Sequence, residues 1–407
     1  MSGWGSDGGR GMSAQLLNEL LDQQLYSRRK SQQWRVRHAI GVLDSTHVEL
    51  YGRRLVNFAS NDYLGLTHHP RVLEAAGQAA VRCGMGSGAS PLITGYSLEQ
   101  QAGEAAIARW KQAEAAVLLA SGYQTAQAVV QTLAAAVKRH GPGGRFLLDK
   151  LCHASLIDAV RGSGVGFRVF PHNHLGKLAR LLAAAPEGQL QIVITESIFS
   201  MDGDAADLAG LAEVKAKHPF VLVLDEAHGS GVYGPAGAGY AAECGLGSVV
   251  DIAIVTLSKA LGLAGGAVCG SGRFCDAVVN CGRAYIYSTS PPAMLAAAAV
   301  AAIGVLRDEP QRQQRVRGIA RRVRTALLDK GIAMCPGDSP IIPVILKSEH
   351  RAMEAAERLR DQGLLVIAIR PPTVAANTSR LRITLSSDHS DDEVEALISA
   401  VSPLRFG

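Results

Sequence analysis

The sequence predicts an α/β fold, in which a mostly parallel central sheet precedes a smaller C-terminal α+β domain. Two patterns carry this prediction. Between residues 115 and 270, short apolar runs alternate with stretches of helical periodicity. Continuous apolar strands separated by helices are typical of a parallel sheet covered by helices on both faces. After a helix-rich segment at 291–330, strands and helices alternate again over about 90 residues, a usual domain length.

Length and composition are those of a globular enzyme with a large core. The chain has 407 residues, of which 47% are apolar and 19% are charged. Its longest apolar runs fall short of the roughly 20 residues that a membrane-spanning helix needs, so we expect no membrane association. The net charge of +5 is spread along the chain without a basic block, which argues against nucleic acid as a partner.

The N-terminal part, residues 1–57, is expected to form an extension and an arm. The first dozen residues, MSGWGSDGGRGM, lack periodicity and are interpreted as a disordered extension. From 14 to about 34, leucines recur at helical spacing, and short strand-like pieces then lead to 55–58. A large domain is expected over 58–308 and a small C-terminal domain over 309–407.

The strands and helices of both domains follow from the apolar pattern. The expected strands of the central sheet are AAVLLASG, RFLLD, GFRVF, QIVITES, FVLVLDE, IAIVTLS and GGAVCG. In the C-terminal domain we expect strand IIPVIL, a helix at 350–360, strands LLVIAI and RLRITL, and a closing helix at 391–401.

Polar side chains gather where strands of the central sheet end. Asp225 follows VLVL, Lys259 follows IAIVTLS, and Ser121-Gly122-Tyr123 precedes a helix. Open parallel sheets bind ligands beyond the carboxyl ends of their strands. Pyridoxal phosphate needs a lysine, an acid for its ring nitrogen and a phosphate cradle, which Lys259, Asp225 and Ser121-Gly122-Tyr123 with Thr256 can supply. A lone lysine is more often a solvated loop residue, but its combination with Asp225 favours a cofactor site.

Two other patterns suggest ligands that the context argues against. Residues 229–234 fit G-x-G-x-x-G, the pattern of dinucleotide-binding loops, but the loop continues to 239 without opening a helix. The pairs His68-His69 and His172-Asn-His174 lack companion ligands at metal spacing, so they are interpreted as surface or capping residues and no metal is expected. The seven cysteines form no C-x-x-C pair and no signal segment opens the chain, which predicts reduced thiols and a cytoplasmic protein.

Five motifs occur together along the chain. They are NDYLGL at 61–66, GSGAS at 86–90, SMDGD at 200–204, DEAHGSGVYG at 225–234 and TLSKALG at 256–262. In these motifs the chain from about residue 14 onward resembles the α-oxoamine synthases, which are fold-type I pyridoxal-phosphate enzymes. The resemblance therefore implies a fold-type I transferase with pyridoxal 5′-phosphate as its cofactor.

The resemblance also implies roles for individual residues. Lys259 would bind the cofactor covalently, Asp225 would pair with its ring nitrogen, and His153 would stack on its ring and contact substrate. His228 and Ser200 would contact the ring hydroxyl region. Gly122, Tyr123 and Thr256 would lie against the cofactor and its phosphate. The substrate-contacting residues would be Arg370, which would hold the amino-acid carboxylate, Thr373 and Arg35.

Residues 369–374, IRPPTV, are most similar to the branch that joins L-alanine to a pimeloyl thioester with loss of carbon dioxide. Coenzyme A and acyl carrier protein both stay open as carriers of the acyl group. The rival substrates are glycine with an acetyl or succinyl thioester and serine with a fatty acyl thioester. A non-catalytic partner subunit is a rival from another class, which would be expected to lack Lys259. Residues 288–292 resemble a segment that reaches a neighbour's phosphate, so a homodimer is expected.

Overall fold

The computed structural model describes residues 8–31, 33–335 and 337–404. Its central sheet has seven strands in the order β4-β10-β9-β8-β7-β5-β6. Their bounds are β4 (Ala115–Leu119), β5 (Gly144–Asp149), β6 (Phe167–Phe170), β7 (Leu190–Glu196), β8 (Val221–Asp225), β9 (Ile252–Thr256) and β10 (Gly266–Gly270). Strand β10 runs antiparallel to both of its neighbours, β4 and β9, and the other neighbouring pairs of this sheet are parallel. Each strand coincides with an expected apolar run, and the predicted α/β fold class is confirmed.

Helices cover both faces of the sheet. They are α2 (Pro70–Cys83), α3 (Leu98–Lys111), α4 (Gly122–Arg139), α5 (Ala154–Gly162), α6 (Leu175–Ala183), α7 (Leu208–Lys217), α8 (Tyr240–Glu243), α9 (Gly272–Cys281), α10 (Arg283–Ile286) and α11 (Ala293–Asp308). Successive strand residues point to opposite faces. Leu148 and Ile194 therefore pack with α4 and α5, whereas Leu147 and Val193 pack with α6 and α7.

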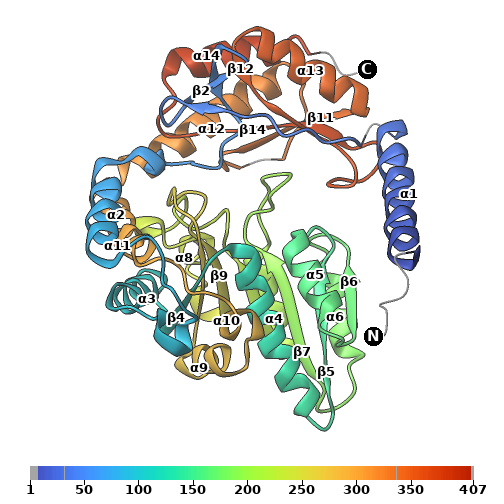
Figure 1. Cartoon of the computed structure of the whole chain (residues 1–407), viewed down its shortest axis with the longest axis vertical. Coiled ribbons are helices and arrows are strands. Elements are labelled where there is room, and N and C mark those ends of the chain that lie inside the picture. The colour runs from blue at the N-terminus through green and yellow to red at the C-terminus, as the bar shows by residue number, and fades with distance from the viewer. Residues whose placement is uncertain (1–7, 32, 336, 405–407) are drawn as a thin grey trace, which may run out of the picture.

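The C-terminal part forms a second layer above the central sheet (Figure 1). It contains α12 (Gln311–Asp329), β11 (Ile341–Lys347), α13 (Glu349–Asp361), β12 (Leu364–Leu365), β13 (Ile367–Ile369), β14 (Ser379–Thr384) and α14 (Asp391–Val401). Strands β11, β14 and β13 form an antiparallel sheet in that order. The expected single strand LLVIAI is wrong, because β12 pairs with β3 (Arg53–Asn57) and only β13 pairs with β14.

The N-terminal part also differs from expectation at its start. Helix α1 (Gly8–Lys30) begins within the segment interpreted as disordered, although residues 1–7 lie outside the described part. Once a helix has nucleated, each added residue needs only one more hydrogen bond, so residues 8–12 can extend it. Strands β1 (Gly41–Val42) and β2 (His47–Leu50) join β3 and β12 in one sheet. A division at residues 57 and 308 remains a proposal.

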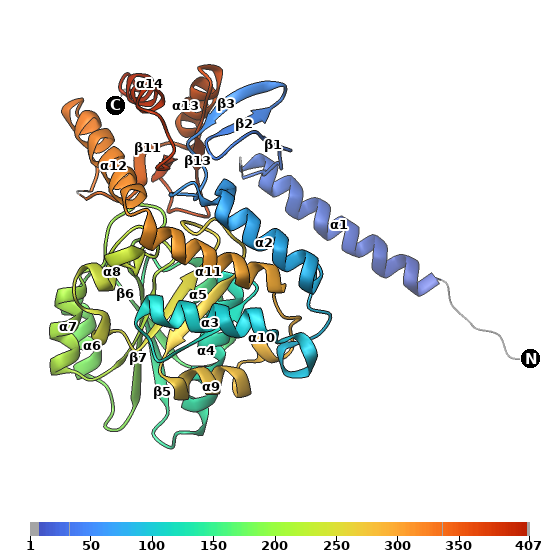
Figure 2. The same cartoon turned by 90° about the vertical axis from the view of Figure 1, so that its left-hand side faces the viewer.

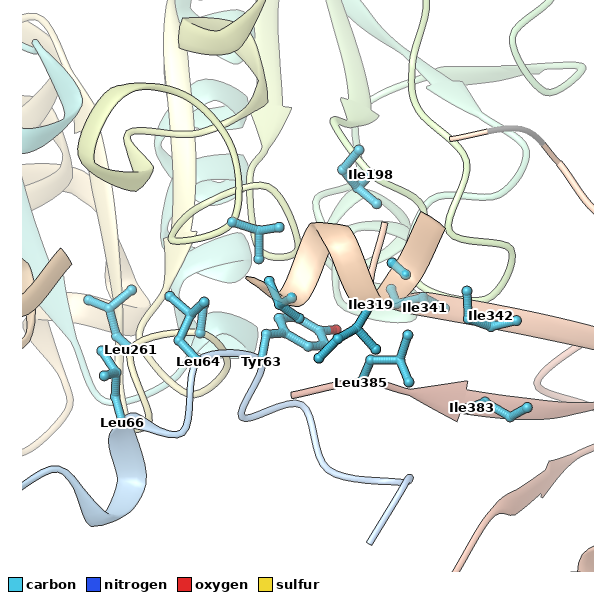
Figure 3. Close-up of a cluster of buried hydrophobic side chains, with 14 of the residues drawn as sticks. Tyr63, Leu64, Leu66, Ile198, Leu261, Ile319, Ile341, Ile342, Ile383 and Leu385 are labelled. Carbon is cyan, nitrogen blue, oxygen red and sulfur yellow. The ribbon is translucent and has the colours of Figure 1, made fainter. Parts of the chain in front are cut away.

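A continuous apolar cluster connects the two layers (Figure 3). Tyr63 and Leu64 belong to this cluster together with Ile198 of the lower layer and Leu385 of the upper layer, and each of the four side chains is at most 2% exposed. Burial of one such apolar side chain contributes roughly 1.5–3 kcal/mol. The cluster therefore stabilises the position of the upper layer over the carboxyl edge of the central sheet. Within the described residues, no helix is long and apolar enough to cross a membrane.

Candidate active site

The loops that follow β4, β5, β8 and β9 enclose a cavity of about 250 Å³ at the carboxyl edge of the sheet. Its lining consists of Ser121, Gly122, Tyr123, His153, Ser155, Glu196, Asp225, Ala227, His228, Ile254, Thr256, Ser258 and Lys259. The parallel strands bring their ends together here, as the strand-end argument predicts. Seven of the expected site residues thus meet in one place, namely Gly122, Tyr123, His153, Asp225, His228, Thr256 and Lys259.

Lys259 begins a chain of buried hydrogen bonds. Its Nζ lies 2.9 Å from His228 Nε2, and His228 Nδ1 lies 2.6 Å from the Tyr63 hydroxyl. Burial lowers the pKa of Lys259 to about 8, although the charges of Asp225 and Glu196 act in the opposite direction. Burial, followed by the charge of Lys259, lowers the pKa of His228 well below its usual value. A neutral His228 can accept from Lys259 at Nε2 and donate to Tyr63 at Nδ1, while Tyr63 donates to Asn61 Oδ1 at 3.2 Å.

Asp225 closes the floor of the cavity at the end of β8. Its carboxylate accepts the backbone N–H of Ala227 at 2.9 Å, and the residue is 6% exposed. Burial raises the pKa of Asp225, against which the charge of Lys259 and the Ala227 N–H act. A buried carboxylate at this position suits a cationic group of a ligand.

His153 stands at the mouth of the cavity as the N-cap of α5. Its Nδ1 accepts the backbone N–H of Ser155 at 3.2 Å and lies 2.9 Å from the Ser155 hydroxyl. Burial, followed by the charge of Lys259, lowers the pKa of His153, which favours a neutral ring. The imidazole is held at one edge and lines the cavity, so a flat ligand can lie against it.

The start of α4 offers a cradle for an anion. Ser121 is the N-cap and accepts the N–H of Gln124 at 3.1 Å, and Gly122 is the first helical residue. A Cβ atom on Gly122 would lie 3.1 Å from the Thr256 hydroxyl, so glycine permits this close approach. The Thr256 hydroxyl is also 2.9 Å from that of Ser258. Hydroxyls beside a helix N-terminus are suited to a phosphate group.

The remaining expected residues lie outside the cavity lining. Arg35 donates to the Thr373 hydroxyl at 3.2 Å, and Arg370 donates to the Trp34 carbonyl at 2.8 Å. Ser200 is buried, and its carbonyl accepts from Arg382 at 2.7 Å. Their expected contacts with cofactor or substrate therefore stay predictions.

Two charged residues of this region are not predicted from the sequence. Glu196 ends β7 and lines the cavity, where burial, followed by the charge of Asp225, raises its pKa to about 8. Its position after the apolar run QIVIT is the same signal that singled out Asp225. Arg382 on β14 joins the Ser200 carbonyl to Asn61 Oδ1, at 2.7 and 3.1 Å. Nothing in the RLRITL pattern distinguishes it from the neighbouring Arg380.

The histidine pairs follow the capping interpretation only in part. His174 caps α6, and His69 occupies the N-cap position of α2 while bonding Glu309 at 3.0 Å. For His172 the interpretation is wrong, because its ring bridges Asp149 at 3.0 Å and Asp204 at 2.7 Å. The sequence hides this pairing because the two carboxylates come from distant loops. The 229–234 loop leads into a short 3-10 turn, Pro235–Gly237.

Comparisons with known proteins agree with this geometry. Residues 53–401 match the family model described as aminotransferase class I and II. The 8-amino-7-oxononanoate synthase of Alkalilimnicola ehrlichii is 37% identical over 96% of this chain and 98% of its own. That of Anaeromyxobacter dehalogenans is 41% identical over 89% of each chain. A serine palmitoyltransferase from S. paucimobilis, solved with pyridoxal phosphate and myriocin bound, is 26% identical with a TM-score of 0.87, covering 94% of this chain and 96% of its own.

Proposed function

The chain belongs to the aminotransferase class I and II family, and we propose from its named relatives that it joins L-alanine to a pimeloyl thioester with loss of carbon dioxide. This is the reaction of the 8-amino-7-oxononanoate synthases, an acyl transfer in biotin biosynthesis. The observation that carries the proposal is the meeting of Lys259, Asp225 and His153 in one strand-end cavity. Relatives of that name, which match nearly the whole chain, support it.

Pyridoxal 5′-phosphate is the cofactor, and the donor set of the cavity suits it. Lys259 offers the amine for covalent attachment, and Asp225 offers a carboxylate for the ring nitrogen. The helix start at Gly122, with the hydroxyls of Thr256 and Ser258, suits the phosphate. His153 would cover the ring face. When bound, the cofactor supplies a protonated ring that withdraws electrons from the α-carbon of the amino acid.

Two further groups would hold the cofactor's ring hydroxyl region. His228 lines the cavity beside Lys259, and its ring is held from behind by Tyr63. Ser200 is the second group, and Arg382 holds its loop by donating to the Ser200 carbonyl at 2.7 Å. We propose that Tyr123, which lines the same cavity, lies against the cofactor on the phosphate side.

The proton transfers of the reaction are proposed to pass through Lys259. An amine whose pKa is lowered to about 8 is available in its neutral form near physiological pH, as a general base must be. His228 accepts a hydrogen bond from this amine and fixes its direction. Lys259 can therefore take the α-proton of alanine and return a proton later, once the carboxylate has left.

The substrate would be held by the cluster of Arg370, Thr373 and Arg35. Arg370 would carry the guanidinium for the alanine carboxylate. The proposal is supported by two contacts, since the Thr373 N–H donates to the Arg370 carbonyl at 3.1 Å and Arg35 donates to the Thr373 hydroxyl. A site shaped for the alanine methyl gains only about 1–3 kcal/mol over glycine, so that preference is expected to be incomplete. The acyl chain of a pimeloyl donor ends in a polar group, whose partners a shorter donor would leave unpaired.

A second copy of the chain is proposed to complete the molecule. Large apolar side chains are exposed along 85–98 and at Tyr287, including Ile93 at 75% and Leu98 at 80%. The 288–292 segment lies beside them, since Ser87 donates to the Ser290 carbonyl at 2.9 Å. An exposed apolar patch of this kind marks a protein interface. This patch, made of Met85, Leu92, Ile93, Leu98 and Tyr287, is called the apolar patch below.

Acyl carrier protein and coenzyme A both remain proposed carriers of the acyl group.

We also propose a cytoplasmic location, because all seven cysteines are free thiols and Cys83, Cys244 and Cys335 are exposed. A reducing compartment keeps such thiols unpaired.

The experiment that tests the function is a single-turnover reaction of the purified protein. Alanine, glycine and serine are each combined with pimeloyl, acetyl, succinyl and palmitoyl thioesters, and products are identified by mass. Alanine with the pimeloyl thioester is expected to react fastest, with release of carbon dioxide. Faster turnover of glycine with a short donor, or of serine with palmitoyl thioester, would reject the substrates while leaving the family chemistry intact.

A further inference from the structure

Two carboxyl groups lie side by side on the floor of the cavity. Glu196 and Asp225 are the last residues of β7 and β8, and they are paired in the register of the two parallel strands. Paired residues of a parallel ladder point to the same face of the sheet. Glu196 is 2% exposed and Asp225 is 6% exposed, and both line the cavity.

The two carboxyl groups have unequal support. Asp225 accepts the Ala227 N–H at 2.9 Å. Glu196 Oε1 is buried and has no hydrogen-bond partner among the residues that the structure describes. Backbone N–H groups of His153 and Ser200 favour the ionised form of Glu196, but they do not outweigh its burial.

The surroundings supply too little positive charge for two carboxylates. The titratable groups that act on the pair include Lys259, His153, Glu226 and the buried Cys152. The histidine pKa is lowered by burial and the thiol pKa is raised by burial, so neither is charged near neutral pH. Lys259 is then the cation that both carboxylates would have to share, and two like charges in one buried site do not ionise together.

We propose that Glu196 is a positioning residue that keeps the proton of this carboxyl pair, so that the negative charge stays on Asp225. The proposal rests on the proposed function, in which Asp225 holds the ring nitrogen of the cofactor. When Glu196 is neutral, Asp225 alone carries the negative charge of the pair, and that charge acts on the ring nitrogen. It also avoids a second carboxylate that would hold a proton on Lys259.

The first test measures the thermal unfolding temperature of the cofactor-free protein between pH 5 and pH 9. In the fold Glu196 keeps its proton up to about pH 8, whereas its ordinary pKa is 4.5. The folded state thus binds a proton that the unfolded chain has lost, so wild-type stability falls across this interval. Glu196→Gln has no such proton. The Tm of E196Q minus that of the wild type should therefore rise from pH 5 to pH 8 and then level off.

The control is Ser197→Ala, a neutral change at the next position, whose hydroxyl is also buried and unpartnered. Its Tm difference from the wild type should not vary with pH. A difference for E196Q that stays flat or falls with pH would overturn the proposal, because a Glu196 that is already ionised at pH 5 in the fold gives no rise.

A second measurement works even if E196Q folds poorly. Infrared absorption of the cofactor-free wild type should contain a protonated-carboxyl band that disappears between pH 7 and pH 9. In Asp225→Asn this band should disappear at lower pH, because the neighbouring charge is gone. A band unaffected by D225N contradicts the pairing.

A third measurement separates this inference from the proposed function. At pH 7, E196Q should bind pyridoxal phosphate within about threefold of the wild type, since glutamine has the shape and charge of the protonated acid. A loss above tenfold would mean that the ionised form is needed. If the wild type itself fails to bind the cofactor, the proposed function falls, while the Tm and infrared outcomes still decide whether Glu196 keeps the proton.

Discussion

At the scale of single residues, the chemistry of Lys259 depends on two buried side chains, His228 and Tyr63. Tyr63 is fully buried, and burial raises its pKa to about 12, so it stays a neutral hydroxyl. It bonds His228 at 2.6 Å, and His228 in turn bonds Lys259 at 2.9 Å. Tyr63 therefore fixes the direction of the Lys259 amine through the ring of His228.

Tyr63→Phe should weaken both the fold and the reaction. The change leaves His228 Nδ1 buried without its partner, which costs about 1–3 kcal/mol of unfolding free energy. Lys259 should then be less well oriented, so kcat should fall more than KM rises. Urea denaturation and steady-state kinetics measure the two effects. Tyr51→Phe is the control, because Tyr51 is 69% exposed, and changes at such sites stay within about 0.5 kcal/mol. Equal effects of the two variants would contradict the relay.

The sequence predicts the identity of the main groups better than their neighbours. Lys259 and Asp225 stand out because each follows an apolar strand with polar residues beside it. Glu196 carries the same signal, but the cofactor needs only one acid for its ring nitrogen, so the pattern alone gives Glu196 no role. Arg382 could not be predicted, because its role depends on the contact of β14 with the Ser200 loop, which is set by tertiary packing.

At the scale of elements, the loops after β5, β6 and β7 are tied together by His172. Its ring bridges Asp149 and Asp204, and the Asn173 N–H donates to Asp149 at 2.8 Å. The first of these loops carries His153 and the last carries Ser200. His172 thus links two loops that are proposed to hold the cofactor.

His172→Gln should destabilise the protein in a pH-dependent way. Burial opposes the charged ring, but Asp149 and Asp204 overcome this and raise the pKa of His172 from 6.5 to about 10. The stabilisation is fully present below pH 6.5 and is lost as pH rises through 10. The loss in unfolding free energy should be about 2 kcal/mol at pH 6, discounted for partial exposure, and should shrink towards pH 10.

Chemical denaturation at pH 6, 8 and 9.5 measures this loss. His174→Gln is the matched control, since His174 only caps the exposed start of α6. A loss for H172Q that does not vary with pH would mean that the ring is neutral and that the bridge has no ionic component.

Local sequence patterns predict some element boundaries correctly and others wrongly. The closing helix was predicted at 391–401, and α14 has those bounds, because Ser390 and Glu393 form a capping box that the sequence displays. The run LLVIAI reads as one strand, yet the chain changes sheets within it. Two partners compete for this run, and apolar periodicity contains no information about which strand, β3 or β14, lies beside each half.

At the scale of the whole molecule, the apolar surfaces point to a second copy. Helix α1 projects from the body of the chain (Figure 2), and Leu16, Leu17 and Leu20 on it are each more than 50% exposed. The apolar patch exposes further side chains near the 288–292 segment. Neither surface could be assigned from sequence, because a pattern of apolar residues does not distinguish a core from an interface.

The dimer can be tested by sedimentation. The wild type should have twice the 42.8 kDa mass of one chain. A double change in the apolar patch, Ile93→Asp with Leu98→Asp, should give a monomer with reduced activity, because two buried charges oppose association. Met353→Asp on α13 is a control at another exposed apolar side chain and should stay dimeric. A wild type that sediments as a single chain would disprove the proposed assembly.

The central claim is that Lys259 and the strand-end cavity around it bind pyridoxal phosphate covalently. The most direct measurement is reduction of the cofactor-loaded protein with borohydride, followed by proteolysis and mass mapping of the pyridoxyl group. Lys259 should carry the label, and Lys259→Ala should carry none while keeping its fold by circular dichroism. A label on another lysine, such as Lys111 with its buried side chain, would contradict the account.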